Sequence, residues 1–368
     1  MIKKAKLIFI SIFCSVLTFG QLAPKYSNEF LAIGVGGRAL SMGNSVVASA
    51  EDISGVYWNP SLVFNLDKQF EVGAMHSEYF AGIAKYDFMS VLYKIDNKSA
   101  AGLSMIRFGV DDIPNTLDLI DSDGNIRYDR LSSFSVADYA FLFTYSRDLN
   151  IKGLSLGGNA KIIRRVAGDF ANAWGFGVDL ACAYHMKNFK AGLTLRDVFG
   201  TFNAWSFNNS LLEEVFIATG NEIPENGLEI TLPKILIGGG YKYDFNQNFS
   251  AYPELGFVIT TDGKRNTLIK TNLISIDPSF GLEFSYKEIV FIRAGVNNFQ
   301  QIPEFDNSVS LNWQPNIGIG VNLFGIKLDY AFTDIGNQSI ALYSNIFSLS
   351  YKFDTDIFRK EPQEKFSN

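Results

Sequence analysis

The feature that most constrains the fold is a two-residue alternation of apolar and polar side chains, which recurs along most of the chain. It is clearest in residues 345–353, where large apolar residues alternate with serine and lysine. The same pattern runs through 326–333, 280–286 and 174–184. Successive side chains of a β-strand point to opposite faces, so this alternation predicts strands with one apolar face and one polar face.

A soluble sandwich and a membrane barrel both give such alternation, and composition separates them. Aromatic residues make up 14% of the chain and include 33 Phe, whereas charged residues make up only 19%. The aromatic residues cluster at strand ends, as in an interfacial girdle, and the polar face is rich in Gly and Ser with scattered charges, as in a lumen. The sequence therefore predicts an all-β protein, a transmembrane antiparallel β-barrel.

Fourteen strands are expected, an even number that suits a closed barrel with both chain ends on the periplasmic side. Their ranges are 69–79, 84–95, 99–109, 136–148, 153–166, 173–186, 189–200, 231–244, 249–262, 277–286, 289–298, 313–323, 326–334 and 343–353.

The connections between these strands alternate in length. Six are short: 96–98, 149–152, 187–188, 245–248, 287–288 and 325. Four of the intervening connections are long: 110–135, 201–230, 263–276 and 299–312. This alternation predicts short periplasmic turns and long outer loops, with the N- and C-termini in the periplasm.

The first twenty residues are predicted to be a secretory signal peptide. Three lysines precede an apolar run at 7–17, and a small residue, Gly20, precedes the expected cleavage before Gln21. The alternative is an uncleaved N-terminal anchor, but the apolar run is too short to span a bilayer. After cleavage only Cys182 is left, which excludes an internal disulfide framework and a cysteine-based metal cluster.

A segment rich in small residues follows the signal peptide and has neither strand nor helix periodicity. We expect it to fill the barrel lumen, which gives four parts: signal peptide 1–20, hatch segment 21–66, barrel 67–353 and a loose periplasmic tail 354–368. The residues predicted to pack in the hatch and lumen are Gly34, Gly36, Gly37, Arg38, Met42, Gly43, Asp52, Trp58, Asn59 and Pro60.

Arg38 needs a charged partner if it is enclosed, because an unpaired buried charge is costly. Glu283, Asp179 and Asp329 are the candidate partners. The pair is either a latch between hatch and wall or, as we favour, an ordinary structural ion pair. Asn59-Pro60 predicts a tight turn before the first strand, and the adjacent Trp58 is expected either at the membrane interface or in the lumen.

The most distinctive stretches of the chain are residues 26–43 (YSNEFLAIGVGGRALSMG), 46–52 (VVASAED) and 57–60 (YWNP), followed by 110–117, 123–125 and 328–332. In these stretches the chain resembles the PorV/PorQ family of FadL-like outer-membrane barrels from Bacteroidetes and relatives. The resemblance implies a fourteen-stranded barrel with an N-terminal hatch and a role in type IX secretion. PorV-like barrels receive cargo with a C-terminal sorting domain at the translocon and pass it to the attachment machinery. Asn44-Ser45 and Ser61 depart from the usual family pattern, so the sequence leaves open which member of the family this chain is.

Two long connections are expected to form the partner-binding surface, through Asp111, Asp112, Pro114, Asn115, Phe202, Trp205, Phe207 and Phe216. The alternative is that these loops only close the barrel mouth. Residues 121–125 loosely resemble a calcium loop but lack its full ligand spacing and terminal Glu, which favours an acidic turn cluster. No metal or cofactor is predicted.

No catalytic motif appears, so we expect a non-enzymatic protein. Its only histidines, His76 and His185, lie on strands far apart in the chain, and a net charge of −6 without a basic stripe argues against nucleic acid as a partner.

The favoured function is a type IX secretion component in the outer membrane. Its expected partners are outer-membrane lipid, the translocon barrel, attachment-complex proteins and the C-terminal domains of secreted cargo. The alternative is a FadL-like transporter of a hydrophobic small molecule. That fits poorly with the polar lumen expected from Asn159, Lys161, Asp179, Lys190, Arg196, Glu283, Arg293, Lys327 and Asp329.

Overall fold

The computed structural model describes residues 27–80, 82–117, 119, 124–220, 222–303, 308–333 and 344–354. The predicted signal peptide at 1–20 and all but the first residue of the predicted tail at 354–368 lie outside this range. Within it, no helix has the length and apolarity needed to cross a bilayer.

Fourteen antiparallel strands close into a barrel, because β1 pairs with β18 in the register Phe70 to Phe353. These strands are β1 (Phe70–Tyr79), β2 (Ala84–Asp96), β3 (Ser99–Asn115), β4 (Ser132–Ile151), β5 (Leu154–Ala167), β6 (Ala171–Met186), β7 (Phe189–Arg196), β10 (Lys234–Tyr241), β12 (Phe249–Thr260), β14 (Ser275–Tyr286), β15 (Val290–Pro303), β16 (Val309–Leu323), β17 (Ile326–Thr333) and β18 (Ser344–Phe353). The predicted fold class is confirmed. The short connections lie together at one end, called the short-turn end below, and the long ones lie at the other, called the long-connection end.

The two faces of the barrel wall differ as the alternation predicts. On β18, Phe347 and Leu349 are half exposed on the outside, while Ser348 and Ser350 are buried on the inside. Aromatic side chains meet near the short-turn end: Phe70 lies 5.0 Å from Tyr93 and 5.4 Å from Phe353, between ring centroids. An apolar outer face with an aromatic girdle is the surface of a barrel that stands in lipid.

The long connections are more ordered than predicted, and this corrects the expected loops at 110–135 and 201–230. β3 continues to Asn115 and β4 starts at Ser132. The second connection forms β8 (Thr201–Phe207), α4 (Asn209–Thr219) and β9 (Gly227–Thr231). Short interruptions hid these strands: a register shift after Val110, with Asp112 at φ 58°, and a break at 197–200 both interrupt the two-residue period.

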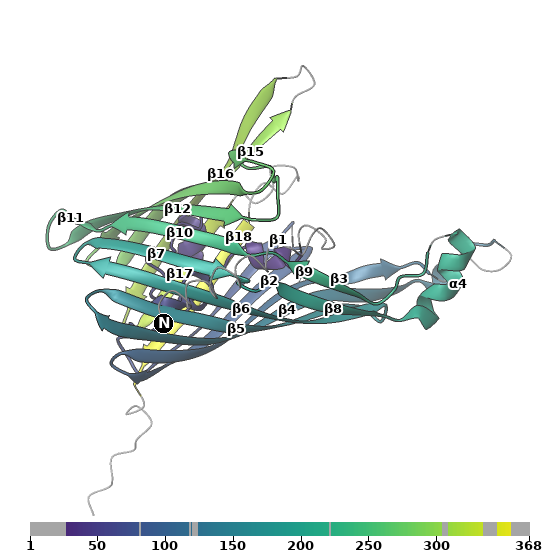
Figure 1. Cartoon of the computed structure of the whole chain (residues 1–368), viewed down its shortest axis with the longest axis horizontal. Helices are drawn as coiled ribbons and strands as arrows, with labels where there is room; N and C mark the ends of the chain where they lie inside the picture. Colours follow the sequence, from purple (N-terminus) through teal and green to yellow (C-terminus); the bar gives the residue numbers. More distant parts are fainter. Residues whose placement is uncertain are drawn as a thin grey trace, which may run out of the picture.

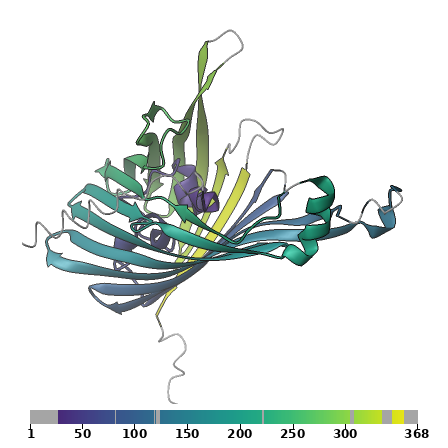
Figure 2. The ribbon, with the colours of Figure 1, turned by 45° about the vertical axis from the view of Figure 1, so that its right-hand side comes forward.

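The long-connection end is therefore asymmetric (Figures 1 and 2). One side extends into a flared sheet made of β3, β4, β5, β6, β8 and β9, with α4 at its tip. On another side the β15–β16 hairpin projects from the rim. The remaining short strands, β11 (Tyr243–Asp244) and β13 (Ile269–Lys270), pair at the edges of β12 and β14.

The described residues before β1 include four short helices, and Figure 1 shows this part of the chain in purple against the inner side of the barrel wall. They are η2 (Glu29–Ala32), α2 (Gly37–Ser41), α3 (Gly55–Trp58) and η3 (Pro60–Leu62). Residues 27–66 are called the N-terminal segment below.

Candidate functional site: the lumen and the flared sheet

The N-terminal segment contacts inward-facing side chains on strands from different parts of the wall. The Gly37 amide donates to Ser348 Oγ on β18 at 3.0 Å, and the Ala48 amide donates to Glu254 Oε1 on β12 at 2.7 Å. On β4, Ser146 Oγ donates to the Ser61 carbonyl at 3.0 Å. These anchors lie on well-separated strands, so the segment contacts more than one side of the wall.

Arg38 joins a chain of alternating charges. Its Nε lies 2.9 Å from Glu283 Oε2, and both side chains are nearly buried. Glu283 also binds Arg293 at 2.5 Å, and Arg293 binds Asp329 at 2.6 Å. Of the three partners considered for Arg38, Glu283 is the one in direct contact. Alternation of sign lets each charge compensate its neighbour where water is scarce.

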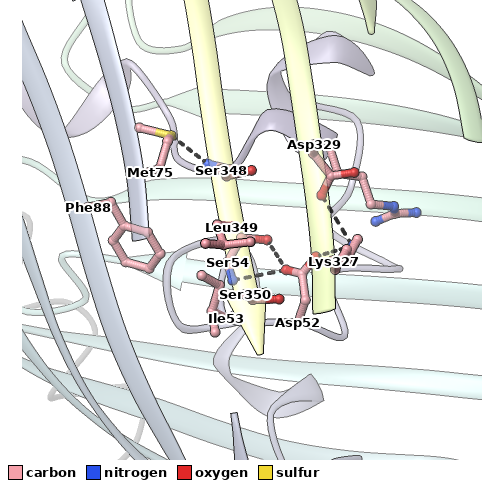
Figure 3. A pocket seen from close by; sticks show the side chains of 12 residues that line it. Asp52, Ile53, Ser54, Met75, Phe88, Lys327, Asp329, Ser348, Leu349 and Ser350 are labelled. Atoms are coloured by element: carbon pink, nitrogen blue, oxygen red, sulfur yellow. Dashed lines mark hydrogen bonds and ion pairs between the residues drawn. The ribbon is translucent and has the colours of Figure 1, made fainter. Parts of the chain in front are cut away.

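Asp52 makes the next contact between segment and wall. Figure 3 shows it pointing toward Lys327 on β17, and their charged atoms lie 2.7 Å apart. Burial alone would raise the pKa of Asp52, but the positive charges of Lys327 and Arg38 hold that pKa far below its usual value. Asp52 is therefore ionised over the whole physiological range.

Near its start the segment is held by Glu29. This carboxylate lies 2.9 Å from Arg265 and 3.2 Å from Lys234. Burial opposes its ionisation, but the hydrogen bond from Arg265 and the charge of Lys234 lower the pKa of Glu29 overall. Asn28, the preceding residue, donates to Thr231 Oγ1 on β9 at 2.8 Å. Four charged residues of the segment, including Glu51 bound to Lys190 at 2.7 Å, thus pair with residues outside it.

Asn59 caps the short helix η3 that precedes the first strand. Asn59 Oδ1 accepts from the Ser61 amide at 3.1 Å, and Pro60 begins η3. Of the two places considered for Trp58, the structure has it buried in the lumen, where its Nε1 donates to the Val35 carbonyl at 2.8 Å. Arg196 lies over the neighbouring Tyr57 ring, 3.9 Å from its centroid.

Small residues allow the closest approach between segment and wall. Gly43 has φ 61°, and a Cβ there would lie 2.7 Å from the Val296 backbone nitrogen. A Cβ on Gly295 of β15 would lie 2.1 Å from the Met42 carbonyl carbon. Eight of the ten predicted lumen residues are buried, and Arg38 and Asp52 are partly buried.

The sequence predicted only part of a buried charged cluster around Lys161. Lys161 Nζ on β5 lies 2.7 Å from Asp179 on β6 and 2.5 Å from Asp197. Lys161 and Asp179 were expected to face inward, but Asp197 lies where the period fails, between β7 and β8. It accepts a hydrogen bond from Thr201 there and anchors the break.

The predicted partner-binding residues lie on ordered elements and not in loops. Asp111, Asp112, Pro114 and Asn115 are on β3, whereas Phe202, Trp205 and Phe207 are on β8, and Phe216 is on α4. Three strands, β4, β5 and β6, separate β3 from β8 in the sheet, so the two groups are not brought together.

A cationic residue organises the inner face of the flared sheet. Arg165 lies 2.8 Å from Asp138 and 3.2 Å from Glu229, and its guanidinium carbon lies 5.0 Å from the Trp205 ring centroid. Trp205 Nε1 also donates to Glu229 at 2.8 Å. Sequence reasoning missed this cluster because its members come from four separate strands.

A polar cavity of about 350 Å³ opens near the short-turn end, beside the charge chain. Its lining includes Arg38, Asp52, Lys190, Tyr252, Glu283 and Lys327. Most of these charged groups already pair with one another, so the cavity has few free charges for a ligand.

The family model of "Type IX secretion system protein PorV" matches residues 24–208, half of the chain. No curated protein matches the sequence.

Solved structures share the fold at low identity. The CymD monoaromatic hydrocarbon channel is 13% identical, with 88% of this chain and 98% of that chain covered and a TM-score of 0.54. The Ralstonia pickettii toluene transporter TbuX is 11% identical, with coverages of 87% and 98% and a TM-score of 0.51. The P. putida toluene transporter TodX is 12% identical, with coverages of 87% and 99% and a TM-score of 0.53.

Proposed function

The chain belongs to the PorV family of type IX secretion proteins, and on that premise we propose that it is a non-catalytic docking barrel of the outer membrane. In this proposal it receives secreted cargo at the translocon, through the cargo's C-terminal sorting domain. It then passes the cargo to the complex that attaches it to the cell surface. The short-turn end faces the periplasm and the flared sheet faces outward.

The observation that carries this proposal is the set of contacts between the N-terminal segment and the inner side of the wall. The N-terminal segment is tied to the wall through Arg38–Glu283, Asp52–Lys327 and Glu51–Lys190, and its backbone packs against the wall at Gly43. A barrel that holds such a plug acts through its rim, because a folded cargo cannot pass through it.

The flared sheet supports the docking role. It is stiffened from inside by the Arg165–Glu229 pair, and it carries exposed apolar side chains at its end, such as Ile217 on α4. Rigid elements that present apolar and aromatic side chains are a common basis for protein recognition.

The test is a deletion strain complemented with three versions of the protein: the natural chain, a flare variant and a hairpin variant. In the flare variant an Asn-Gly turn replaces residues 208–226 and joins β8 directly to β9. In the hairpin variant a turn replaces 300–312 in the β15–β16 hairpin, as the matched control. We expect the deletion and the flare variant to retain sorting-domain cargo in the periplasm, and the natural chain to recover both cargo and translocon on affinity purification.

Normal cargo secretion in the deletion strain, together with no recovery of cargo or translocon, would contradict the proposal. Equal loss of secretion in the flare and hairpin variants would show that the flared sheet has no special role in docking.

The alternative proposal, transport of a hydrophobic small molecule, is prompted by the fold shared with hydrocarbon channels. The charge chain through Arg293 and Asp329 and the polar lining of the 350 Å³ cavity beside it weigh against transport. Unchanged uptake of labelled fatty acid and toluene in the deletion strain would reject transport.

A further inference from the structure

Six charged or titratable side chains lie on the outer face of neighbouring strands β1, β2 and β3. We call them the outward polar cluster: His76, Glu78, Lys85, Asp87, Arg107 and Asp111. Their chain neighbours, including Met75, Tyr86 and Ile106, are buried on the lumen side. Alternation along each strand therefore directs the cluster away from the lumen.

Strand register arranges three of these residues in one row. His76 lies opposite Asp87, and Asp87 lies opposite Arg107. The next outward row toward the short-turn end is Ala74, Met89 and Met105 in the same register. An apolar row and a charged row are thus direct neighbours on a wall that faces the membrane.

The height of the apolar band can be measured along other strands. On β6, Trp174 lies ten residues from Tyr184, and on β16 Trp313 lies ten residues from Leu323. Both tryptophans are about half exposed. At a rise of about 3.3 Å per residue and a tilt of about 40°, ten residues climb about 25 Å, the height of the apolar band of outer-membrane barrels.

The same measure places the charged row inside the band. On β1 the band starts at Phe70, within the aromatic girdle, and ten residues further lies the exposed Phe80. His76 lies six residues from Phe70, which is about 15 Å up the wall by the same rise and tilt. Beyond this row come Glu78 and Lys85 of the same cluster, which lie opposite each other, and then the exposed Phe80 and Ile83. Along β1 and β2 the cluster as a whole therefore has apolar outer side chains on both sides.

The cluster is only partly self-compensated. Asp87 lies 2.7 Å from His76 and 3.4 Å from Arg107, and Lys85 lies 3.3 Å from Asp111. Three carboxylates face two permanent cations, so the cluster is negative when His76 is neutral. Side-chain exposure within it still ranges from 23% for Arg107 to 59% for Glu78. Lipid tails cannot satisfy these groups, and charges in the lipid-facing wall of a barrel are destabilising.

We propose that the β1–β3 wall is the contact surface for a second, different integral membrane protein. The wall of that partner protein presents cationic or hydrogen-bond donor side chains at the same depth in the membrane. A second copy of this chain is a poor occupant, because its matching cluster carries the same negative charge. The wall formed by β14, β15 and β16, with Phe280, Ile292 and Ile317 exposed, is an ordinary lipid face. The inference rests on the wall alone and holds whether or not the protein serves in secretion.

The test places a photo-activated benzoylphenylalanine at Met89 in the full-length protein in intact cells. Met89 is 54% exposed and adjoins the cluster without belonging to it. The matched control is the same probe at Ile317 on β16, which is 58% exposed and is separated from β1 by β17 and β18. We expect one discrete adduct with an integral outer-membrane protein from Met89, and lipid adducts only from Ile317.

A second variant tests the charges. In the H76L/D87L/R107L background the Met89 adduct should fall at least tenfold, while heat-modifiable gel migration shows that the barrel still folds. The inference is overturned if Met89 yields lipid only, if both probe positions yield the same protein, or if the adduct is a second copy of this chain. It is also overturned if the adduct persists in the folded triple variant. Where the triple variant does not fold, the comparison of Met89 with Ile317 decides alone.

Discussion

Arg38 and Glu283 form a nearly buried ion pair at 2.9 Å although 245 positions separate them in the chain. The first lies in the N-terminal segment and the second on the tenth of the fourteen barrel strands. Their pairing is therefore a direct measure of whether the segment is in place.

Removal of one partner should loosen the segment. E283A leaves Arg38 and Arg293 without their shared carboxylate, and an uncompensated buried charge of this kind costs about 3–5 kcal/mol. Denaturant unfolding with tryptophan fluorescence measures the change, and Trp58 reports the segment itself. The control is Lys68→Ala in the exposed pair with Asp354, for which we expect a change of about 1 kcal/mol or less. Equal effects of the two substitutions would argue against a tie between segment and wall.

A methyl group at Gly295 should displace the segment without any change of charge. Its Cβ would overlap the Met42 backbone, and overpacking of this kind costs about 1–3 kcal/mol. Limited proteolysis should then cut the N-terminal segment of G295A faster than that of the natural protein. Gly227→Ala is the control, since its Cβ would meet nothing closer than 3.9 Å. Equal cleavage rates in all three proteins would rule out close packing at this position.

Stability should fall in acid through Asp52. Its pKa in the folded protein is lowered, so its contribution is fully present above the unfolded value of about 3.9 and is lost as the pH falls from there toward the folded value. The difference in unfolding free energy between the natural protein and D52N should be constant from pH 7 to about 5 and shrink below about 4. Denaturant unfolding at pH 7, 5, 4, 3 and 2.5 measures it. A difference that is independent of pH down to 2.5 would contradict the assignment.

The flared sheet offers two adjacent arginines with different environments. Arg165 faces inward and binds Asp138 and Glu229, so R165L should cost about 1.5–3 kcal/mol and expose Trp205. Arg164 faces outward, over the Trp174 ring at 4.8 Å, and R164L should leave Trp205 unchanged. Iodide quenching of tryptophan fluorescence, read with the other tryptophans replaced by Phe, distinguishes the two. Similar quenching in both variants would show that Arg165 does not hold the sheet.

The barrel could be predicted from the sequence because its rule is local. Alternation marks each strand, and short links such as Lys187–Asn188 join neighbours, so pairing follows chain order. The prediction fails where a few residues interrupt the two-residue period. The break at 197–200 made β8 unrecognisable in the sequence, and the register shift after Val110 did the same for the end of β3. The fold class could therefore be predicted from the sequence, but the secondary structure of the long connections could not.

The contacts between elements were beyond sequence reasoning for a different reason. The sequence left three carboxylates as candidate partners of Arg38. Only the tilt and register of β14 bring Glu283 next to Arg38. The Arg165 cluster and the outward polar cluster each draw on three or more strands. Their members become neighbours through register, which single positions do not reveal.

The position of the N-terminal segment has a consequence for the order of assembly. The N-terminal segment binds strands that are made much later: Gly37 bonds to Ser348, 311 residues later, and Asp52 pairs with Lys327, 275 residues later. β1, which follows the segment, likewise finds its second neighbour only when β18 arrives. Contacts of such separation form late and slowly. These contacts of the segment therefore form only when the final strands arrive, in the same step as the closure of the wall.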